Sequence, residues 1–331
     1  MYRSYTEPMY PFLAAAVYLA TNHNQTALVL LQLLIAAATI WVVGTLPNGN
    51  IAALLLAIHP GFIRYSSVLH PFVLDSFFFI AAAAALLRFR HDPSLRRGMV
   101  AALLIGLGAL TRPTILLYLI PLIWTAAAKP PLSHSVQKML LLGGVALAVV
   151  APWTIRNAFV HHTFMLTRSG SGLVFWLGNN PHSTGSATDT AGQPVIRHAP
   201  PELLHAKNEV ERDRVFREAA WQYIRARPLA AIGRFAQRVY YFWWFSPQWG
   251  AAFSPALKLA YRAWWVVLLT MMAVGATRNR SRDVWFLVGI AVLISLIQSV
   301  YYVEGRHRLA IEPLLLPLAA LGMRRRDAGV P

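Results

Sequence analysis

The sequence contains no cysteine and few charged residues, and both shortages narrow the kinds of protein that it can encode. Without cysteine, disulfide bonds, thiolate catalysis and cysteine-based metal sites are excluded. Charged residues make up 13% of the 331 residues, against about 25% in soluble domains. Hydrophobic residues reach 56%, and the mean hydropathy is +0.47. This composition cannot cover the surface of a soluble protein, so we expect an all-α polytopic membrane protein.

Acidic residues are scarcer still, with 13 Asp and Glu against 30 Lys and Arg, which gives a net charge of +17. A basic balance of this size can indicate nucleic-acid binding. The basic residues, however, gather at the ends of apolar runs, where Lys and Arg set the orientation of membrane proteins. We therefore exclude nucleic acid as a partner. The groups in question are Arg88, Arg90, Arg96 and Arg97, then Arg278, Arg280 and Arg282, and finally Arg324, Arg325 and Arg326.

The chain contains nine apolar runs, from which we predict a bundle of about nine transmembrane helices. A helix that crosses a bilayer needs about 20 residues, so the shorter runs are expected to lean on neighbouring helices. Pro113 interrupts the stretch 98–128 and predicts two short helices that meet there. The runs are 25–46, 50–62, 72–88, 98–111, 113–128, 139–155, 254–275, 284–303 and 309–323.

The basic loops orient this bundle. With Arg88–Arg97 in the cytoplasm, the other short basic loops (129–138 and 276–283) fall on the same side, as the positive-inside rule requires. The loops 63–71 and 304–308 are then external. Five segments follow: an external interfacial segment (1–24), transmembrane helices (25–155), an external polar loop with an amphipathic helix near 201–226 (156–253), C-terminal transmembrane helices (254–323) and a cytoplasmic basic tail (324–331).

Counting the membrane crossings back from these loops places residue 24 outside the cytoplasm. The run from Pro8 to Ala20 is too short to span a bilayer and rich in Tyr and Pro, which favours an interfacial helix. The sequence shows no targeting peptide that would carry its start across the membrane. We therefore expect a further helix upstream of Met1; the alternative is that the first run spans after all.

Two acids are candidates for chemistry. Asp75 lies in Leu74–Asp75–Ser76, near the external end of its helix, and a carboxylate in a membrane helix usually faces a cavity or a partner. The alternative is that it only caps the helix N-terminus. Glu7 lies on the same side and could act as a general base or a metal ligand. Its alternative is an exposed terminal residue.

Four arginines at the external ends of apolar runs predict a phosphate-binding or pyrophosphate-binding surface. Guanidinium groups bind phosphate through paired hydrogen bonds and stay charged when partly buried. A single arginine in such a place can equally extend to the lipid headgroups. This alternative is weaker for a group, because the positive-inside rule disfavours arginine on the external side. The four are Arg112, Arg156, Arg306 and Arg308.

Several motifs resemble those of bacterial membrane glycosyltransferases of the GT-C fold, which are relatives of protein O-mannosyltransferases and of lipid A aminoarabinose transferases. The resemblance covers essentially the whole chain, and the order and spacing of the motifs make it specific. The motifs are Pro152–Asn157 followed by Gly178–Pro181 and Gly185 ("PWTxRN…GNNPxxxG"), Glu7–Pro11 ("EPLYP"), Leu74–Ser76 ("LDS"), and Glu304–Arg308 with Glu312–Leu314 ("RYRLPxEPLLL").

The resemblance implies a reaction. Such enzymes pass a sugar from a polyprenyl-phosphate carrier to a glycan, lipid or protein acceptor on the external face of the bacterial inner membrane. A carboxylate base and positive charge for the departing phosphate are then needed, and a divalent metal can supply part of that charge. By match of motif, Asp75 and Glu7 are the candidates for the catalytic acid, and Arg306 and Arg308, supported by Arg156 and Asn157, are the candidates for binding the phosphate. From their positions in the sequence, Arg112, Asn179 and Asn180 are further candidates for binding the substrate.

One departure from the family separates the possible functions. These enzymes carry a transmembrane helix and an external loop with their principal acid ahead of the "EPLYP" stretch, and here only a few residues precede it. The chain could therefore be a truncated enzyme or an inactive relative. A transporter or flippase for lipid-linked substrates would use the same arginines. The long external insert, together with the lack of a convincing internal repeat, favours the enzyme.

Overall fold

The computed structural model describes residues 4–127, 132–246, 249, 253–278 and 281–323. Lys129, Arg280 and the predicted tail 324–331 lie outside these residues. Regular structure in the described chain is helical, apart from one isolated bridge between Thr188 and Pro194. The predicted all-α polytopic membrane fold is confirmed.

The elements follow one another along the chain as α-helices and short 3₁₀ segments (η). They are α1 (Met9–Thr21), α2 (Gln25–Gly44), α3 (Gly49–Ala57), α4 (Pro60–Ser66), α5 (Phe72–His91), α6 (Leu95–Ala109), η1 (Pro113–Tyr118), α7 (Leu119–Ala127), α8 (Leu132–His161), α9 (Ser171–Gly178), η2 (Val195–His198), η3 (Pro201–His205), α10 (Glu209–Ala226), α11 (Pro228–Trp243), α12 (Pro255–Arg278), α13 (Arg282–Gln298), α14 (Gly305–Leu309), η4 (Glu312–Leu314) and α15 (Leu316–Met323).

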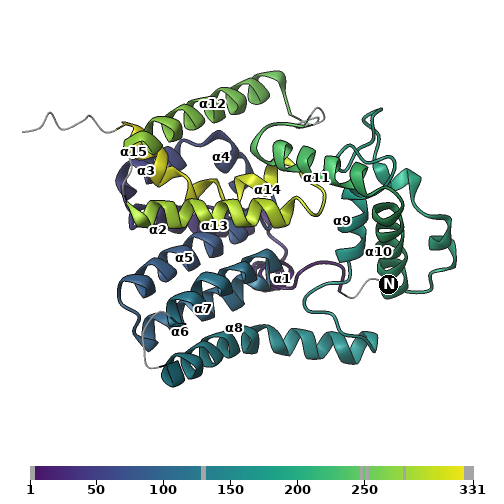
Figure 1. Ribbon diagram of the computed structural model, residues 1–331, viewed down its shortest axis with the longest axis horizontal. Helices are drawn as coiled ribbons and strands as arrows, with labels where there is room; N and C mark the ends of the chain where they lie inside the picture. Colours follow the sequence, from purple (N-terminus) through teal and green to yellow (C-terminus); the bar gives the residue numbers. More distant parts are fainter. Residues whose placement is uncertain (1–3, 128–131, 247–248, 250–252, 279–280, 324–331) are drawn as a thin grey trace, which may run out of the picture.

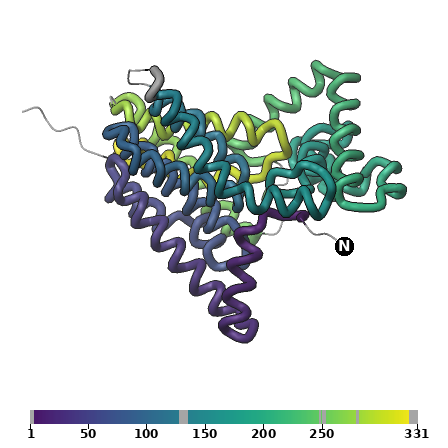
Figure 2. The backbone as a smooth tube through the Cα atoms, turned by 90° about the horizontal axis from the view of Figure 1, so that it is seen from below, coloured from purple at the N-terminus to yellow at the C-terminus, as the bar shows by residue number. Residues whose placement is uncertain are grey.

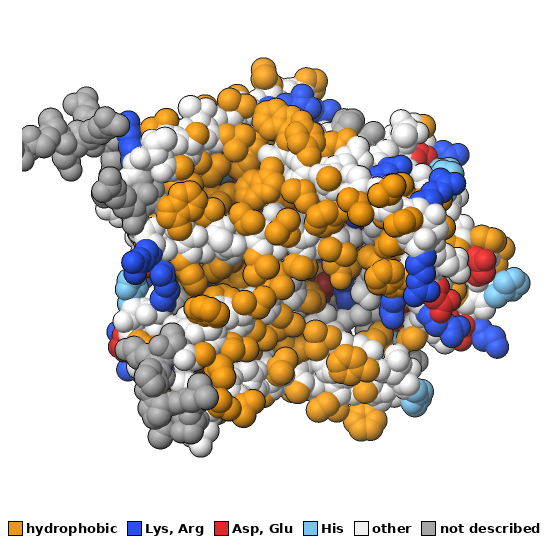
Figure 3. All heavy atoms as spheres, in the orientation of Figure 1, with side chains coloured by type: hydrophobic (Ala, Val, Ile, Leu, Met, Phe, Trp, Pro, Cys, Tyr) orange, Lys and Arg blue, Asp and Glu red, His pale blue; other side chains and the backbone are white. Residues whose placement is uncertain are grey.

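The long helices run side by side, and α9, α10 and α11 gather at one end of them (Figure 1). Four described helices are long and apolar enough to cross a membrane: Gln25–Gly44, Phe72–His91, Ser135–His161 and Pro255–Arg278. Hydrophobic side chains cover the middle of the face in Figure 3, whereas Lys and Arg lie mostly at its two ends. An apolar flank between charged ends is what a lipid bilayer requires of a spanning bundle.

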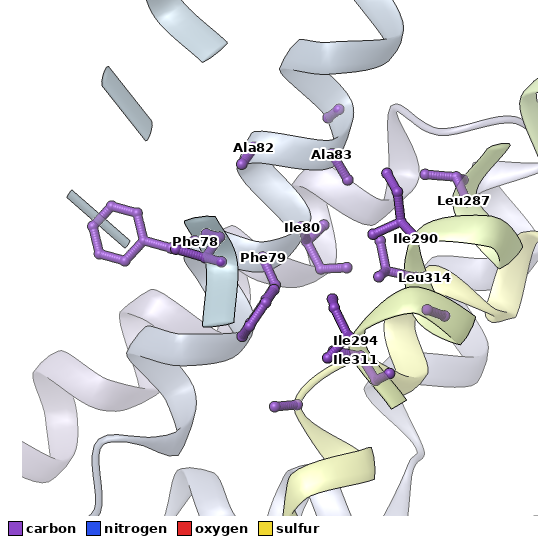
Figure 4. Close-up of a cluster of buried hydrophobic side chains, with 14 of the residues drawn as sticks. Phe78, Phe79, Ile80, Ala82, Ala83, Leu287, Ile290, Ile294, Ile311 and Leu314 are labelled. Atoms are coloured by element: carbon purple, nitrogen blue, oxygen red, sulfur yellow. The ribbon is translucent and has the colours of Figure 1, made fainter. Parts of the chain in front are cut away.

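Helix α5 is the centre of the bundle, because its span is 78% buried, against 17% for α8 and 22% for α12. It has no polar face, and a helix that is apolar all round is stable only when other helices enclose it. Five consecutive alanines from Ala81 to Ala85 let its neighbours approach closely. Figure 4 shows part of this buried cluster, in which Ile80 and Ala83 of α5 face Leu287, Ile290 and Leu314, whereas Phe78 points away from them.

Proline and capping residues divide three of the predicted segments. The run 50–62 forms two helices, because His59 accepts the Phe62 N–H and caps α4 at Pro60. The run 309–323 is broken into α14, η4 and α15, with prolines in the latter two. The amphipathic helix begins at Glu209 instead of residue 201, since Asn208 caps it. The break predicted before Pro113 is confirmed, because α6 ends at Ala109 and η1 starts at Pro113.

Helices α1 and α2 form a hairpin that projects from the other helices (Figure 2). Asn22 and His23 turn the chain with positive φ angles, and the Asn24 side chain caps α2. At the other end of α1, the Met9 N–H donates to the Leu110 carbonyl at 3.1 Å. This bond fixes the start of α1, and with it Glu7, beside the end of α6.

Candidate active site

A cavity of about 960 Å³ lies where the segment before α1, the start of α5, the loop after α8 and the loop before α14 meet. Its wall contains five arginines and three carboxylates, so positive charge prevails by two and favours an anionic ligand. The arginines are Arg112, Arg168, Arg214, Arg217 and Arg306, and the acids are Glu7, Asp75 and Asp213. The structure thus brings together four of the sequence-predicted residues: Glu7, Asp75, Arg112 and Arg306.

Asp75 lies in the first turn of α5 and binds Arg112 of the α6–η1 junction. Its Oδ2 accepts from Nε and Nη2 of Arg112, each at 2.8 Å, and the side chain is 1% exposed. Oδ1 is buried without a partner among the described residues, since the nearby Thr111 hydroxyl donates to the Gly108 carbonyl instead. No side chain caps α5. Asp75 therefore anchors a cavity arginine and does not act as a helix cap.

Glu7 is the more accessible of the two predicted acids. Its side chain is 17% exposed, and its Oε1 lies 3.2 Å from Nε of Arg168, in the loop that follows α8. It therefore faces the cavity and is not a solvated terminal residue. The sequence pattern gave no sign of Arg168, because this residue follows neither an apolar run nor a motif.

The predicted substrate-binding residues Arg156 and Asn157 hold the N-terminal segment in place instead of lining the cavity. The buried Asn157 accepts from the Ser4 hydroxyl at 2.8 Å, and Arg156 donates to the same hydroxyl oxygen at 2.6 Å. Glu209 of α10 accepts the Ser4 N–H at 3.2 Å. Three residues beyond Ser4 lies Glu7, so this cluster determines where Glu7 stands.

Arg306 lies on the cavity wall, and its predicted partner Arg308 does not. Arg306 donates from Nε to Glu304 at 2.9 Å and from Nη2 to the Tyr302 hydroxyl at 3.1 Å, with the side chain 33% exposed. Arg308 is 0% exposed and points into the bundle. The two residues are separated by about 200° around a helix, which explains why they face opposite ways.

Arg308 belongs to a fully buried charge network. Its Nε donates to Glu312 at 2.6 Å, and its guanidinium carbon lies 3.8 Å from the centre of the Trp265 ring. Glu312 also accepts from the Tyr261 hydroxyl at 2.9 Å and contacts Nε2 of His59 at 2.5 Å. Nδ1 of His59 accepts the Phe62 N–H, which orients the ring beside Glu312. Arg308 and Glu312 thus pair as cation and anion inside the bundle.

Asn179 and Asn180 also have structural partners. Asn179 donates to the Val300 carbonyl at 2.9 Å and accepts from Arg238 at 3.1 Å, while Asn180 donates to the Trp176 carbonyl at 2.8 Å. Arg238 of α11 is buried, which lowers its pKa to about 10 and leaves it charged at neutral pH. A Cβ on Gly178 would lie 2.7 Å from the Tyr301 backbone carbon. The "GNNP" motif therefore ties α9 to the loop that carries the cavity residues Tyr301 and Tyr302.

Helix α10 of the polar insert contributes a second side of the cavity. Asp213 pairs with Arg217 one turn later and accepts the Gly172 N–H of α9 at 2.5 Å. Arg214, 65% exposed, pairs at 3.8 Å with Glu218. The sequence predicted the amphipathic character of this segment. It did not predict that the charged face of α10 lines the same cavity as Glu7 and Asp75.

The described residues do not fit a protein-held divalent metal. No group of three His, Asp or Glu side chains in this part of the chain is placed to bind an ion. Glu7 and Asp75 are each paired with an arginine, whose charge repels a cation. We therefore derive no step through a metal.

Comparison with known proteins agrees with the motifs in the first half of the chain. Residues 6–155, a little under half of the chain, match the family model described as dolichyl-phosphate-mannose-protein mannosyltransferase. No protein of curated function and no solved structure matches the chain. The family match indicates an integral membrane glycosyltransferase that uses a lipid-linked sugar. Over residues 6–155 the chain is thus similar to this family, and its resemblance to GT-C membrane glycosyltransferases is confirmed.

Proposed function

We propose that this protein transfers a sugar from a polyprenyl-phosphate carrier to an acceptor on the external face of a bacterial inner membrane. The observation that carries the proposal is the single cavity in which Glu7, Asp75, Arg112 and Arg306 converge. Positive charge prevails on its wall by two, which favours an anionic substrate such as the phosphate of a lipid carrier.

The chemistry assigns different roles to the two acids. Transfer forms a bond between the acceptor oxygen and the anomeric carbon, and the carbon–oxygen bond to phosphate breaks with its electron pair. The acceptor's proton passes to a base, and Glu7 is the more open carboxylate, at 17% exposure against 1% for Asp75. Asp75 instead positions Arg112, which together with Arg306 stabilises the charge that develops on the phosphate.

The test is a transfer assay with the purified protein in nanodiscs, using radiolabelled polyprenyl-phosphate hexoses and pentoses and membrane extract as acceptor. Glu7→Gln should lower kcat about 100-fold or more, as expected for loss of a general base. Glu202→Gln, at an exposed acid of η3 that is outside the cavity wall, is the matched control and should transfer at the wild-type rate. Transfer by Glu7→Gln at the wild-type rate would refute the assignment of the base. No transfer of any donor by the wild-type protein would favour a transporter or an inactive relative.

A further inference from the structure

Two histidines of the cavity wall are held in the same way. His70 precedes α5, and its Nδ1 accepts the Phe72 N–H at 3.1 Å. His307 lies in α14, and its Nδ1 accepts the Glu304 N–H at 3.2 Å as half of a capping box. A ring nitrogen that accepts a hydrogen bond uses its lone pair and cannot carry a proton. Both neutral rings must therefore carry their proton on Nε2.

Nε2 of each ring is left without a protein partner in the part of the chain that the structure describes. Within the described chain, no protein group forms a hydrogen bond with Nε2 of His70 or His307. Neither atom is among the polar atoms that are buried without a partner, so each remains open to the cavity that both residues line. The two rings thus present fixed N–H donors to whatever occupies the cavity.

Burial, with help from the surrounding arginines, keeps both rings neutral. Burial lowers the pKa of His70 to about 4, and Arg306 and Arg112 lower it further than burial alone would. Burial also holds the pKa of His307 well below its ordinary value, assisted by Arg112, Arg306 and Arg168. His70 itself also lowers the pKa of His307, and the rings of Tyr65 and Tyr302 have centres 5.7 Å from His70 and 5.2 Å from His307, respectively.

We propose that His70 and His307 donate their Nε2 protons to phosphate oxygens held between Arg112 and Arg306. Four side chains on this part of the wall then offer donors, and an anion with several acceptor oxygens fits such a set better than a sugar hydroxyl. A neutral donor adds a hydrogen bond without adding a proton that could be lost to the substrate. The proposal rests on the proposed function in so far as this phosphate belongs to the lipid carrier; a free phosphate has the same chemistry.

Paired substitutions separate the donor role of Nε2 from the capping role of Nδ1. In His307→Asn the side-chain amide lies where Nδ1 was, so the cap can persist while the donor at Nε2 is lost. In His307→Gln the amide reaches the Nε2 position, so the donor can persist while the cap is lost. The donor role predicts that His307→Asn weakens the binding of farnesyl phosphate about 10- to 100-fold and that His307→Gln keeps it within about threefold. The same pair at His70 should behave alike.

Binding is measured by calorimetry on the full chain in nanodiscs, with farnesyl phosphate and inorganic phosphate as probes. His198→Asn, in η2 and outside the cavity wall, is the matched control and should bind as the wild type does. If His307→Asn binds normally, or if His307→Gln loses as much affinity as His307→Asn, the donor role is refuted. Weaker binding of both probes by His307→Asn supports it, and the tighter probe identifies the source of the phosphate.

A spectroscopic readout is independent of transfer. In the ¹⁵N-histidine spectrum, both rings should show the neutral form with the proton on Nε2, and farnesyl phosphate should shift these two Nε2–H signals. Protons on Nδ1, or signals that do not shift on saturation, would overturn the proposal. A protein that binds farnesyl phosphate through these protons yet transfers no sugar would refute the proposed function alone.

Discussion

Replacement of Arg308 by methionine should lower the stability of the protein, whereas replacement of Arg306 by methionine should lower its affinity for phosphate. Arg308→Met removes the cation that balances a carboxylate exposed by only 1%, and breaking a buried pair costs about 3–5 kcal/mol. Arg306→Met removes a pair in which both side chains are 33% exposed, which contributes at most about 1 kcal/mol. If Arg306 contacts phosphate, however, its loss should weaken farnesyl phosphate binding about 10- to 100-fold.

The assay combines the free energy of unfolding, from SDS titration in mixed micelles, with calorimetric binding of farnesyl phosphate in nanodiscs. Arg308→Met should be destabilised, and its folded fraction should bind the probe as the wild type does. A double variant, Arg308→Met with Glu312→Met, removes both charges and should recover about 2 kcal/mol or more relative to Arg308→Met, because no unpaired ion is left inside. A stable Arg308→Met that has lost the probe would refute this reasoning and restore Arg308 as a phosphate ligand.

Three further predictions concern packing, pH and positioning. Gly275→Ala should cost about 1–3 kcal/mol in SDS unfolding, because a Cβ there overlaps the Leu318 carbonyl of α15, whereas Gly143→Ala in α8 meets nothing within 4 Å and should be neutral or slightly stabilising. The pKa of His70 falls on folding from 6.5 to about 4, so the unfolded chain takes up its proton first as the pH drops. The Tm should therefore fall between pH 6.5 and 4, and less steeply in His70→Gln. Asn157→Ala removes the acceptor of the Ser4 hydroxyl and loosens the cluster that positions Glu7, so it should lower kcat for transfer about tenfold, with farnesyl phosphate binding unchanged.

The cavity residues that the sequence predicted share one physical basis. Charged groups avoid the middle of a membrane, so those at the ends of apolar runs on one side must lie in one layer. Counting runs was enough to place Glu7, Asp75, Arg112 and Arg306 in the same layer, and the structure places all four on one wall. The alanine-rich run of α5 likewise indicated a helix, although not that it would be the most enclosed of the four long ones.

The remaining predictions depended on information that a linear pattern does not contain. Arg306 and Arg308 lie on opposite sides of the short helix α14. Because the chain breaks again near Pro313, the sequence did not show which of the two sides faces the cavity. Arg156 and Asn157 sit in a recognisable motif, but the role of a motif depends on what packs against it, here Ser4 of the N-terminal segment. Arg168 reaches Glu7 from a loop whose path is set by tertiary contacts alone.

Protection of an engineered cysteine tests most directly the central claim, which is that the cavity opens on the external face and holds the phosphate of the carrier. The chain has no cysteine, so Thr163→Cys on the cavity wall gives a single reactive thiol, and Ser94→Cys in the loop between α5 and α6 gives its counterpart at the other end of the bundle. In intact spheroplasts, a membrane-impermeant maleimide should label only Thr163→Cys, and polyprenyl phosphate should block that labelling. Labelling of Ser94→Cys alone, or labelling of Thr163→Cys at an undiminished rate with the carrier present, would contradict the account.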